Sequence, residues 1–225
     1  MKKLFRKNLL GFSLIELSIV ILIIGILVAG VTQGSRLVRE SRVTTAKTLT
    51  ESSDVSSIPD LTLWLDATDA ATIGSNGLPN GFSGEVFGNS EDGDYVSTWQ
   101  DKNPQLSSKI NLTQTTGSYR PLYEEQGISG LPSIDFNGSD EYLANTTSVP
   151  ITSGDDTFTI AVVWSGDTVT SSDTILSQNG SVWGSGDDAV TLIAQTSSVR
   201  YYTDNASYDT IAPSLVANKE YITIV

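Results

Sequence analysis

The sequence predicts an α+β protein in which a long N-terminal transmembrane α-helix precedes an all-β antiparallel sandwich. Residues 12–31 form an apolar run of twenty residues with a single ionisable side chain. After residue 60 the apolar residues alternate with polar ones in short runs, as in half-buried strands. The charge also divides the chain, because residues 1–47 contain eight basic and two acidic groups, whereas residues 48–225 contain five and 24. Two segments in different physical environments are therefore expected.

The composition excludes several kinds of chemistry. The 225 residues include no His and no Cys, which rules out a Ser-His-Asp triad, a cysteine nucleophile and any imidazole or thiolate metal site. The net charge of −13 argues against a nucleic-acid partner, which requires a basic surface. The Glu-x-Asp-x-(x)-Glu strand typical of glucanases is also absent. We expect no enzymatic activity and no cofactor, except for a hard cation such as calcium.

Residues 12–53 are predicted to form one helix. At about 1.5 Å per residue, the apolar run spans roughly 30 Å, the thickness of a bilayer core. A cleaved secretory signal is the alternative, but its apolar region is usually only about 7–15 residues long. Val28-Ala29-Gly30 also fits the A-x-A cleavage pattern poorly. The segment after the run has good helix formers and no proline, so the helix should continue out of the membrane to about Ser53.

Glu16 is the one ionisable residue of the apolar run. A carboxylate within a membrane span costs roughly 2.5–3.5 kcal/mol on insertion scales, so it is expected to have a partner and a function. Its position is also informative, because it follows Phe12 by four residues, and Phe12 follows Gly11 at the end of a basic leader. Four cations in this leader should hold the N-terminus in the cytoplasm. They are Lys2, Lys3, Arg6 and Lys7.

The run Gly11-Phe12-Ser13-Leu14-Ile15-Glu16-Leu17 resembles the class III signal of type IV pilins and of type II secretion pseudopilins, and the resemblance covers residues 1–50. It implies that a prepilin peptidase removes leader 1–11 after Gly11 and methylates the new amine of Phe12. It also implies that Glu16 pairs with the terminal amine of a neighbouring subunit during assembly. An ordinary signal anchor is the alternative interpretation.

The segment after the helix is predicted to be a Ser-rich linker at residues 54–60 followed by a β domain at 61–225. Asn-Gly, Asp-Gly and Ser-Gly pairs separate the expected strands. The expected strands are 61–66, 95–100, 109–115, 132–136, 141–144, 157–164, 174–177, 189–195, 199–203 and 221–225. Many short strands at this spacing favour a sandwich or a barrel.

Four runs in this region look like the opening half of concanavalin A-like, laminin G-like jelly-roll domains. They are Leu61-Thr-Leu-Trp-Leu-Asp-Ala-Thr-Asp69, Val96-Ser-Thr-Trp-Gln-Asp-Lys102, Arg120-Pro-Leu-Tyr123 and the run 130–143. The resemblance implies two curved antiparallel sheets that bind glycans or protein ligands, sometimes with calcium. Because the chain stops at Val225 within an expected strand, the sandwich is expected to be incomplete at its C-terminus.

Ligand-binding candidates in the β domain are aromatic residues that can stack on a sugar ring, although tryptophan in a sandwich more often lies in the core. They are Trp99, Trp183 and Tyr202. Calcium candidates are loop carboxylates, although such residues in an acidic protein often serve only turns and solubility. They are Asp92, Asp94 and Asp140.

The function expected from these features is that of a minor pilin or pseudopilin subunit. It would insert in the bacterial inner membrane with a single pass and assemble with other subunits into a pilus or a secretion pseudopilus. Its β-sandwich head would lie in the periplasm or outside the cell on the filament. The alternative is a glycan- or ligand-binding adhesin anchored by its N-terminal helix.

Overall fold

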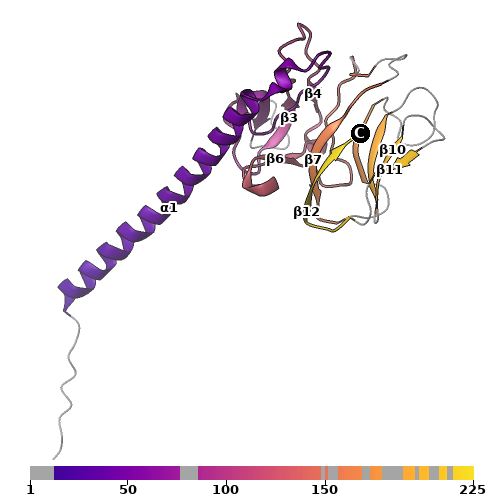
Figure 1. The fold of residues 1–225 in the computed structure, drawn as a ribbon. Helices are drawn as coiled ribbons and strands as arrows, with labels where there is room; N and C mark the ends of the chain where they lie inside the picture. The colour runs from indigo at the N-terminus through magenta and orange to yellow at the C-terminus, as the bar shows by residue number, and fades with distance from the viewer. Residues whose placement is uncertain are drawn as a thin grey trace, which may run out of the picture. The chain divides into compact units, whose positions relative to one another are not determined.

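The computed structural model shows one long helix followed by antiparallel β-sheets, which confirms the predicted α+β class (Figure 1). It describes residues 13–76, 86–147, 150–151, 157–168, 173–178, 190–195, 198–202, 208–211 and 215–225. Gly11, Phe12 and Trp183 lie outside these ranges. The chain forms two compact units, residues 1–45 and residues 46–225, and each is described by itself. The last turns of the long helix belong to the second unit, which we call the head.

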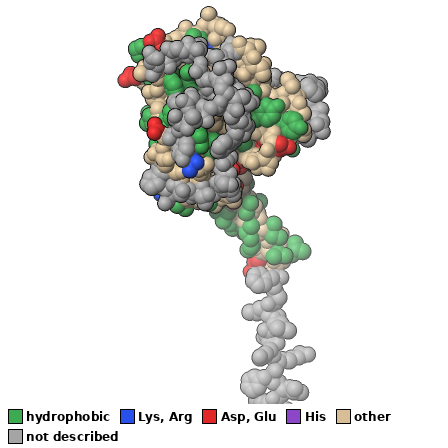
Figure 2. Space-filling view, turned by 90° about the vertical axis from the view of Figure 1, so that its right-hand side faces the viewer, with side chains coloured by type: hydrophobic (Ala, Val, Ile, Leu, Met, Phe, Trp, Pro, Cys, Tyr) green, Lys and Arg blue, Asp and Glu red, His purple; other side chains and the backbone are tan. Residues whose placement is uncertain are grey.

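Helix α1 runs from Leu14 to Glu51, and none of its residues is buried. Its first half is long and apolar enough to cross a membrane. Polar side chains in this half bond to the helix itself, since the hydroxyls of Ser18 and Thr32 donate to the carbonyls of Leu14 and Val28 at 2.8 and 2.9 Å. Hydrophobic side chains make up most of the exposed surface of this half of the helix (Figure 2).

The first sheet of the head has six short antiparallel strands. Its order is β2-β1-β3-β5-β6, and β4 also pairs with β3. The strands are β1 Ile73–Asn76, β2 Val86–Phe87, β3 Tyr95–Trp99, β4 Leu112–Thr113, β5 Leu122–Glu124 and β6 Ser133–Asp135. Ile73, Val96 and Tyr123 form a buried cluster on this sheet. Short 3-10 helices connect some strands; they are η2 Ala70–Thr72, η3 Gly117–Tyr119 and η4 Ile128–Gly130.

The remaining strands form two more antiparallel sheets. A four-stranded sheet has the order β11-β10-β9-β8, and β12 pairs with β7 in the other. The strands are β7 Ala161–Gly166, β8 Asp173–Ser177, β9 Thr191–Gln195, β10 Ser198–Tyr202, β11 Tyr208–Thr210 and β12 Lys219–Ile224. The second core cluster contains Trp164, Leu192 and Val199. These sheets are consistent with a sandwich head, and the jelly-roll topology stays a prediction.

The chain between the helix and the first sheet departs from the expected pattern. Residues 54–57 of the predicted linker form a 3-10 helix, η1 Asp54–Ser57. The predicted strand at 61–66 is wrong, because this segment has no regular secondary structure and pairs with no strand. The predicted strand at 141–144 is also wrong, since only Ala144 forms a bridge, to Thr113.

Side chains from residues 101–105 explain why 61–66 joins no sheet. Asp101 accepts a hydrogen bond from the Trp64 N–H at 3.0 Å, and the side-chain amide of Asn103 donates to the Leu61 carbonyl. Just before this segment, Gln105 donates in the same way to the carbonyls of Ser56 and Ile58 at 3.0 and 2.8 Å. Because these polar groups take up backbone positions that a neighbouring strand would otherwise bond, the segment is held without β pairing.

Candidate functional site

Glu16 lies in the first turn of α1 and bonds to the residue before the helix. Its Oε2 accepts a hydrogen bond from the Ser13 N–H at 2.9 Å, and the Leu17 N–H donates to the Ser13 carbonyl at 3.1 Å. This is one half of a capping box, in which the acidic residue satisfies a backbone donor that the helix leaves open. It also places negative charge at the positive end of the helix dipole. The Ser-x-x-Glu spacing of residues 13–16 is the sequence signal for this cap.

The capping bond does not neutralise the Glu16 charge. In the part of the chain that the structure describes, no Lys or Arg side chain forms an ion pair with Glu16. The nearest such pair on the same helix joins Arg36 to Glu40 at 2.7 Å, about five turns further along. A carboxylate in an apolar span without a cation is costly, so its partner should come from another molecule or from residues outside the described ranges.

The apolar side chains around Glu16 are also exposed. Leu14 is 82 % exposed and Val31 is 73 % exposed, and no side chain of the helix is buried. Gly25, Gly30 and Gly34 have open space where a Cβ would stand, which allows close approach of another helix. This surface requires lipid or other helices around it.

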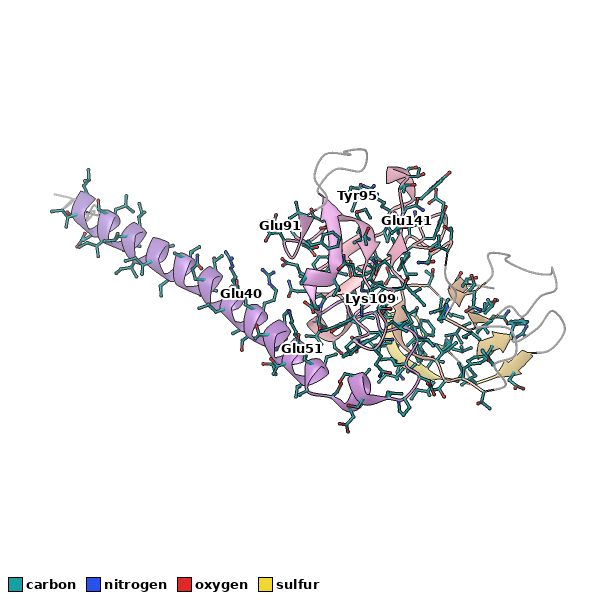
Figure 3. The ribbon with its side chains drawn as sticks, turned by 90° about the horizontal axis from the view of Figure 1, so that it is seen from above. Glu40, Glu51, Glu91, Tyr95, Lys109 and Glu141 are labelled. Atoms are coloured by element: carbon teal, nitrogen blue, oxygen red, sulfur yellow. The ribbon has the colours of Figure 1, made fainter. Side chains whose placement is uncertain are left out.

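A cluster of charged residues holds the C-terminal end of α1 within the head. We call Lys47, Glu51, Asp66, Asp69 and Lys102 the ion-pair cluster. Lys47 Nζ lies 2.7 Å from Asp69 Oδ1, and Lys102 Nζ lies 3.0 Å from Asp69 Oδ2 and 3.2 Å from Asp66 Oδ2. Lys102 also lies 3.6 Å from Glu51, which projects from the last turns of α1 (Figure 3).

Because several of its members are buried, loss of one partner from the ion-pair cluster should destabilise the fold more than loss of an exposed ion pair would. Asp66 and Asp69 are buried, and the Lys102 side chain is only 14 % exposed. Burial alone would raise the pKa of Asp69, but hydrogen bonds and charges from Lys47 and Lys102 outweigh it, so this pKa lies below its ordinary value. Burial likewise opposes the charge of Lys102, and the two aspartates outweigh it and raise its pKa.

Sequence reasoning missed the role of this cluster. Asp66, Asp69 and Lys102 fall within two of the runs that carry the jelly-roll resemblance, but nothing in the local sequence pairs them. Lys102 bonds to Asp66 across 36 residues of sequence, and Lys47 bonds to Asp69 across 22. Two features of the sequence were compatible with this cluster. A lysine directly follows Trp99-Gln-Asp101, and two aspartates lie three residues apart in a Leu-rich run.

The two predicted ligand-binding aromatics within the described residues, Trp99 and Tyr202, lie in different sheets. Trp99 in β3 packs against the cluster of Ile73, Val96 and Tyr123, and its indole nitrogen is buried. Tyr202 ends β10 in the four-stranded sheet and is partly buried. The structure therefore assigns Trp99 mainly to the core of the first sheet. The role of Tyr202 stays a prediction.

The predicted calcium ligands each bond within or next to a turn. Asp94 accepts from the Glu91 N–H at 3.0 Å, Asp92 from the Glu125 N–H at 3.0 Å, and Asp140 from the Asn137 side-chain amide at 2.8 Å. Within the described ranges, no group of three or more acidic side chains has the arrangement of a metal site. Calcium binding stays a prediction to which these contacts add no support.

Carboxylates on β5, β6 and the turn that follows make part of the head surface strongly acidic. Burial raises the pKa values of Glu124, Asp135 and Glu141, and the charges of neighbouring carboxylates raise them further. Asp167, after β7, is one of the charges that act on Glu124 and Asp135. This surface should repel anionic ligands.

Comparison with known proteins identifies the N-terminal segment. Residues 6–32 match the family model described as the prokaryotic N-terminal methylation motif. Neither the curated proteins nor the solved structures contain a significant match to the chain. The motif includes Gly11, Phe12 and Glu16, and it indicates a type IV pilin-like substrate of a prepilin peptidase. Together with the apolar helix, it indicates a single-pass, membrane-anchored protein that assembles with other pilins.

Proposed function

We propose that this protein is a minor pilin or pseudopilin whose helix assembles with other subunits while its β-rich head is displayed in the periplasm or outside the cell. The observation that carries the proposal is Glu16, a carboxylate without a described cation at the start of an apolar helix none of whose residues is buried. It lies within the methylation motif of residues 6–32. The proposed role is structural and not catalytic.

The proposed chemistry at the N-terminus has two steps. Hydrolysis of the Gly11–Phe12 peptide bond leaves a carboxylate on Gly11 and a free amine on Phe12, and a methyl group is then transferred to that amine from a donor bound by the peptidase. Methylation leaves the amine cationic at neutral pH. The Phe12 amine of one subunit can then pair with Glu16 of another, so that each charge removes the other's desolvation cost.

The ion-pair cluster supports a role for the head as part of the assembled unit. Lys47 and Glu51 belong to the helix, Asp66 and Asp69 to the segment that leads into the first sheet, and Lys102 to the loop after β3. These bonds join the last turns of the helix to the head over a short distance. The last turns of the helix are therefore part of the fold of the head.

Mass spectrometry of the mature N-terminus in the bacterial host tests the processing step. The expected N-terminal peptide begins at Phe12 and is heavier by one methyl group. A mature chain that begins at Met1, or one that is cut near Ala29, would show that the pilin proposal is wrong.

The variant Glu16→Ala tests the assembly step, with Glu40→Ala as its matched control on the same helix. Loss of Glu16 leaves the Phe12 amine of the neighbouring subunit without its counter-charge, so incorporation into filaments should fall by about tenfold or more, while membrane insertion and cleavage persist. Glu40 is exposed and paired with Arg36 on its own helix, so its loss should leave incorporation unchanged. Quantitative immunoblots of sheared filaments and membranes give both values. Normal incorporation of Glu16→Ala would contradict the pairing argument.

A further inference from the structure

The ribbon formed by β7 and β12 carries apolar side chains on both of its faces. On one face, Trp164 and Thr223 are buried, and Trp164 belongs to the second core cluster. On the other face, Val163 is 57 % exposed, Ile222 is 73 % exposed and Ile224 is 62 % exposed. Val163 lies opposite Ile222 in the register of the two strands. Because a sheet face turned to solvent ordinarily carries polar residues, this face is suited to contact with another chain.

The backbone along the outer edge of β12 is unpaired. Ile160 and Val225 exchange both of their backbone hydrogen bonds, at 2.7 and 2.9 Å, and such bonded pairs alternate along antiparallel strands. The N–H and C=O groups of Glu220, Ile222 and Ile224 therefore point away from β7. Among the described residues, β12 pairs with no strand except β7, and the backbone groups of these three residues have no partner. This edge is open to an added strand.

Several other edge strands of the head are much shorter. β2 has two residues, and β6 and β11 have three each. β12 has six residues and no proline, and its Ile222 and Ile224 side chains face solvent. Proteins normally avoid long apolar edges, because such edges pair with other chains. The retention of one in a folded head indicates that the edge serves binding.

The beginning of β12 lies at an acidic end of the ribbon. Glu220 accepts hydrogen bonds from the N–H and the hydroxyl of Ser129, and these bonds favour its ionised form and lower its pKa. Asp167 follows the end of β7, and its charge helps to raise the pKa of Glu124. Lys219 lies on the opposite face from Glu220, because successive side chains of a strand alternate. A segment bound along β12 would therefore meet negative charge at one end and isoleucine side chains at the other.

We propose that the outer edge of β12 binds an extended segment of another protein, which adds as an antiparallel strand with apolar residues beside Ile222 and Ile224 and a basic residue beside Glu220. Backbone hydrogen bonds supply affinity, and the alternating side chains supply selectivity. The C-terminal end of an antiparallel strand lies beside Glu220, so the basic residue belongs near that end. A second copy of the head fits less well, because residues 48–225 contain 24 acidic and five basic groups and would repel it.

The test uses the full chain in nanodiscs of zwitterionic lipid, with empty nanodiscs as the blank. The probe is a labelled peptide that alternates threonine with valine and has a lysine two residues after its last valine. Its ends are acetylated and amidated, so that only the lysine carries charge. Fluorescence anisotropy should show saturable binding. Replacing the lysine by glutamate should weaken binding by about tenfold or more at low salt, and added salt should narrow this difference.

N-methylated peptides test the backbone bonds without changing the protein. In the proposed register, the valine amides face β12 and the threonine amides face away from it. A methyl group on a valine amide removes a donor and obstructs the edge, so it should weaken binding by about tenfold or more. A methyl group on a threonine amide should have little effect.

Ile222→Pro and Val163→Pro form a matched pair of protein variants. The two residues lie opposite each other and their N–H groups point to opposite edges of the ribbon, so neither proline removes a bond between β7 and β12. Ile222→Pro should weaken binding by about tenfold or more, whereas Val163→Pro alters the far edge and should leave binding nearly unchanged. Circular dichroism reports folding. If Ile222→Pro does not fold, Ile224→Lys makes the comparison, with Val163→Lys as its control.

Four results would overturn the proposal. They are a lack of saturable binding, equal binding of the lysine and glutamate peptides, equal effects of the two N-methylations, and loss of binding in Val163→Pro but not in Ile222→Pro. Self-association of the chain that Ile222→Pro abolishes would overturn it as well, because it would assign the edge to a second copy. None of these results depends on processing at Gly11, so failure here and failure of the pilin proposal are distinguishable.

Discussion

Glu16 and Asp69 are both carboxylates that require a cationic partner, but they differ in where that partner lies. Asp69 is buried within the head, and two lysines of the same chain lie 2.7 and 3.0 Å from it. Glu16 lies on a helix with no buried residue and bonds only to the backbone N–H of Ser13 among the described groups. Asp69 is thus neutralised within the head, whereas the charge of Glu16 requires a partner in another molecule or outside the described residues. A change to the ion-pair cluster should therefore affect folding, and a change to Glu16 should affect assembly.

The largest effect on stability is expected from Lys102→Ala. This change leaves Asp66 and Asp69 buried with one lysine fewer, and loss of one partner from a buried ion pair costs about 3 kcal/mol. Chemical denaturation of the full chain in detergent, followed by tryptophan fluorescence, measures the loss. Lys109→Ala is the matched control, because Lys109 is exposed and should change stability by less than about 0.5 kcal/mol. Equal effects of the two variants would show that the head does not depend on internal charge pairing.

The difference between local patterns and contacts across the chain also explains which features could be predicted from the sequence. The helix follows from hydropathy and the absence of proline, which are local properties, and the role proposed for Glu16 rests on its position after Gly11-Phe12. The ion-pair cluster depends on contacts between residues far apart in the chain. The alternating leucines of 61–66 predicted a strand, but Asp101 and Asn103, 37 and 42 residues away from their partners, bond to that backbone. Alternation describes side chains and does not determine which groups bond to the backbone.

Short polar strands were missed for a related reason. β1 contains Gly74-Ser75-Asn76, which has low strand propensity, yet it lies between β2 and β3. The Ser75 hydroxyl bonds to Ser90 at 2.8 Å, and the Ser97 hydroxyl bonds to the Gly74 carbonyl at 3.0 Å. Tertiary hydrogen bonds of this kind stabilise the strand where its own residues do not, and no local pattern indicates them.

A smaller effect is expected at the second core cluster from Thr223→Val. The Trp164 indole N–H donates to the Thr223 hydroxyl at 3.0 Å, and both side chains are buried. Valine keeps the shape but leaves the indole donor without an acceptor, which costs about 1–3 kcal/mol. Thr223→Ser keeps the acceptor and should lose less. Denaturation monitored by tryptophan fluorescence distinguishes them, and equal stabilities of Thr223→Val and the wild type would show that this internal bond contributes little.

The smallest expected effect is the pH dependence of folding stability, and its sign differs between two parts of the head. Asp69 has a lowered pKa, so its contribution to stability is present above the unfolded value of 3.8 and is lost as the pH falls through its folded pKa. Glu124 and Glu141 have raised pKa values, because burial and neighbouring carboxylates disfavour their charged forms. Their protonated forms favour the folded state, so stability should rise as the pH falls from neutral toward the unfolded value of 4.5.

Thermal unfolding of the full chain between neutral pH and pH 3 should therefore show a mildly acidic maximum. Glu124→Gln/Glu141→Gln removes two of the repelling charges and should flatten the rise on the neutral side of the maximum, whereas the fall below pH 3.8 persists because Asp69 keeps its two lysines. Added salt should also flatten the rise, since it screens exposed charges, and it should change the acidic fall less because the ion-pair cluster is partly buried. A maximum that the glutamine substitutions leave unchanged would show that the acidic surface does not oppose folding. The contrast between buried paired charges and exposed repelling ones would then fail within the head itself.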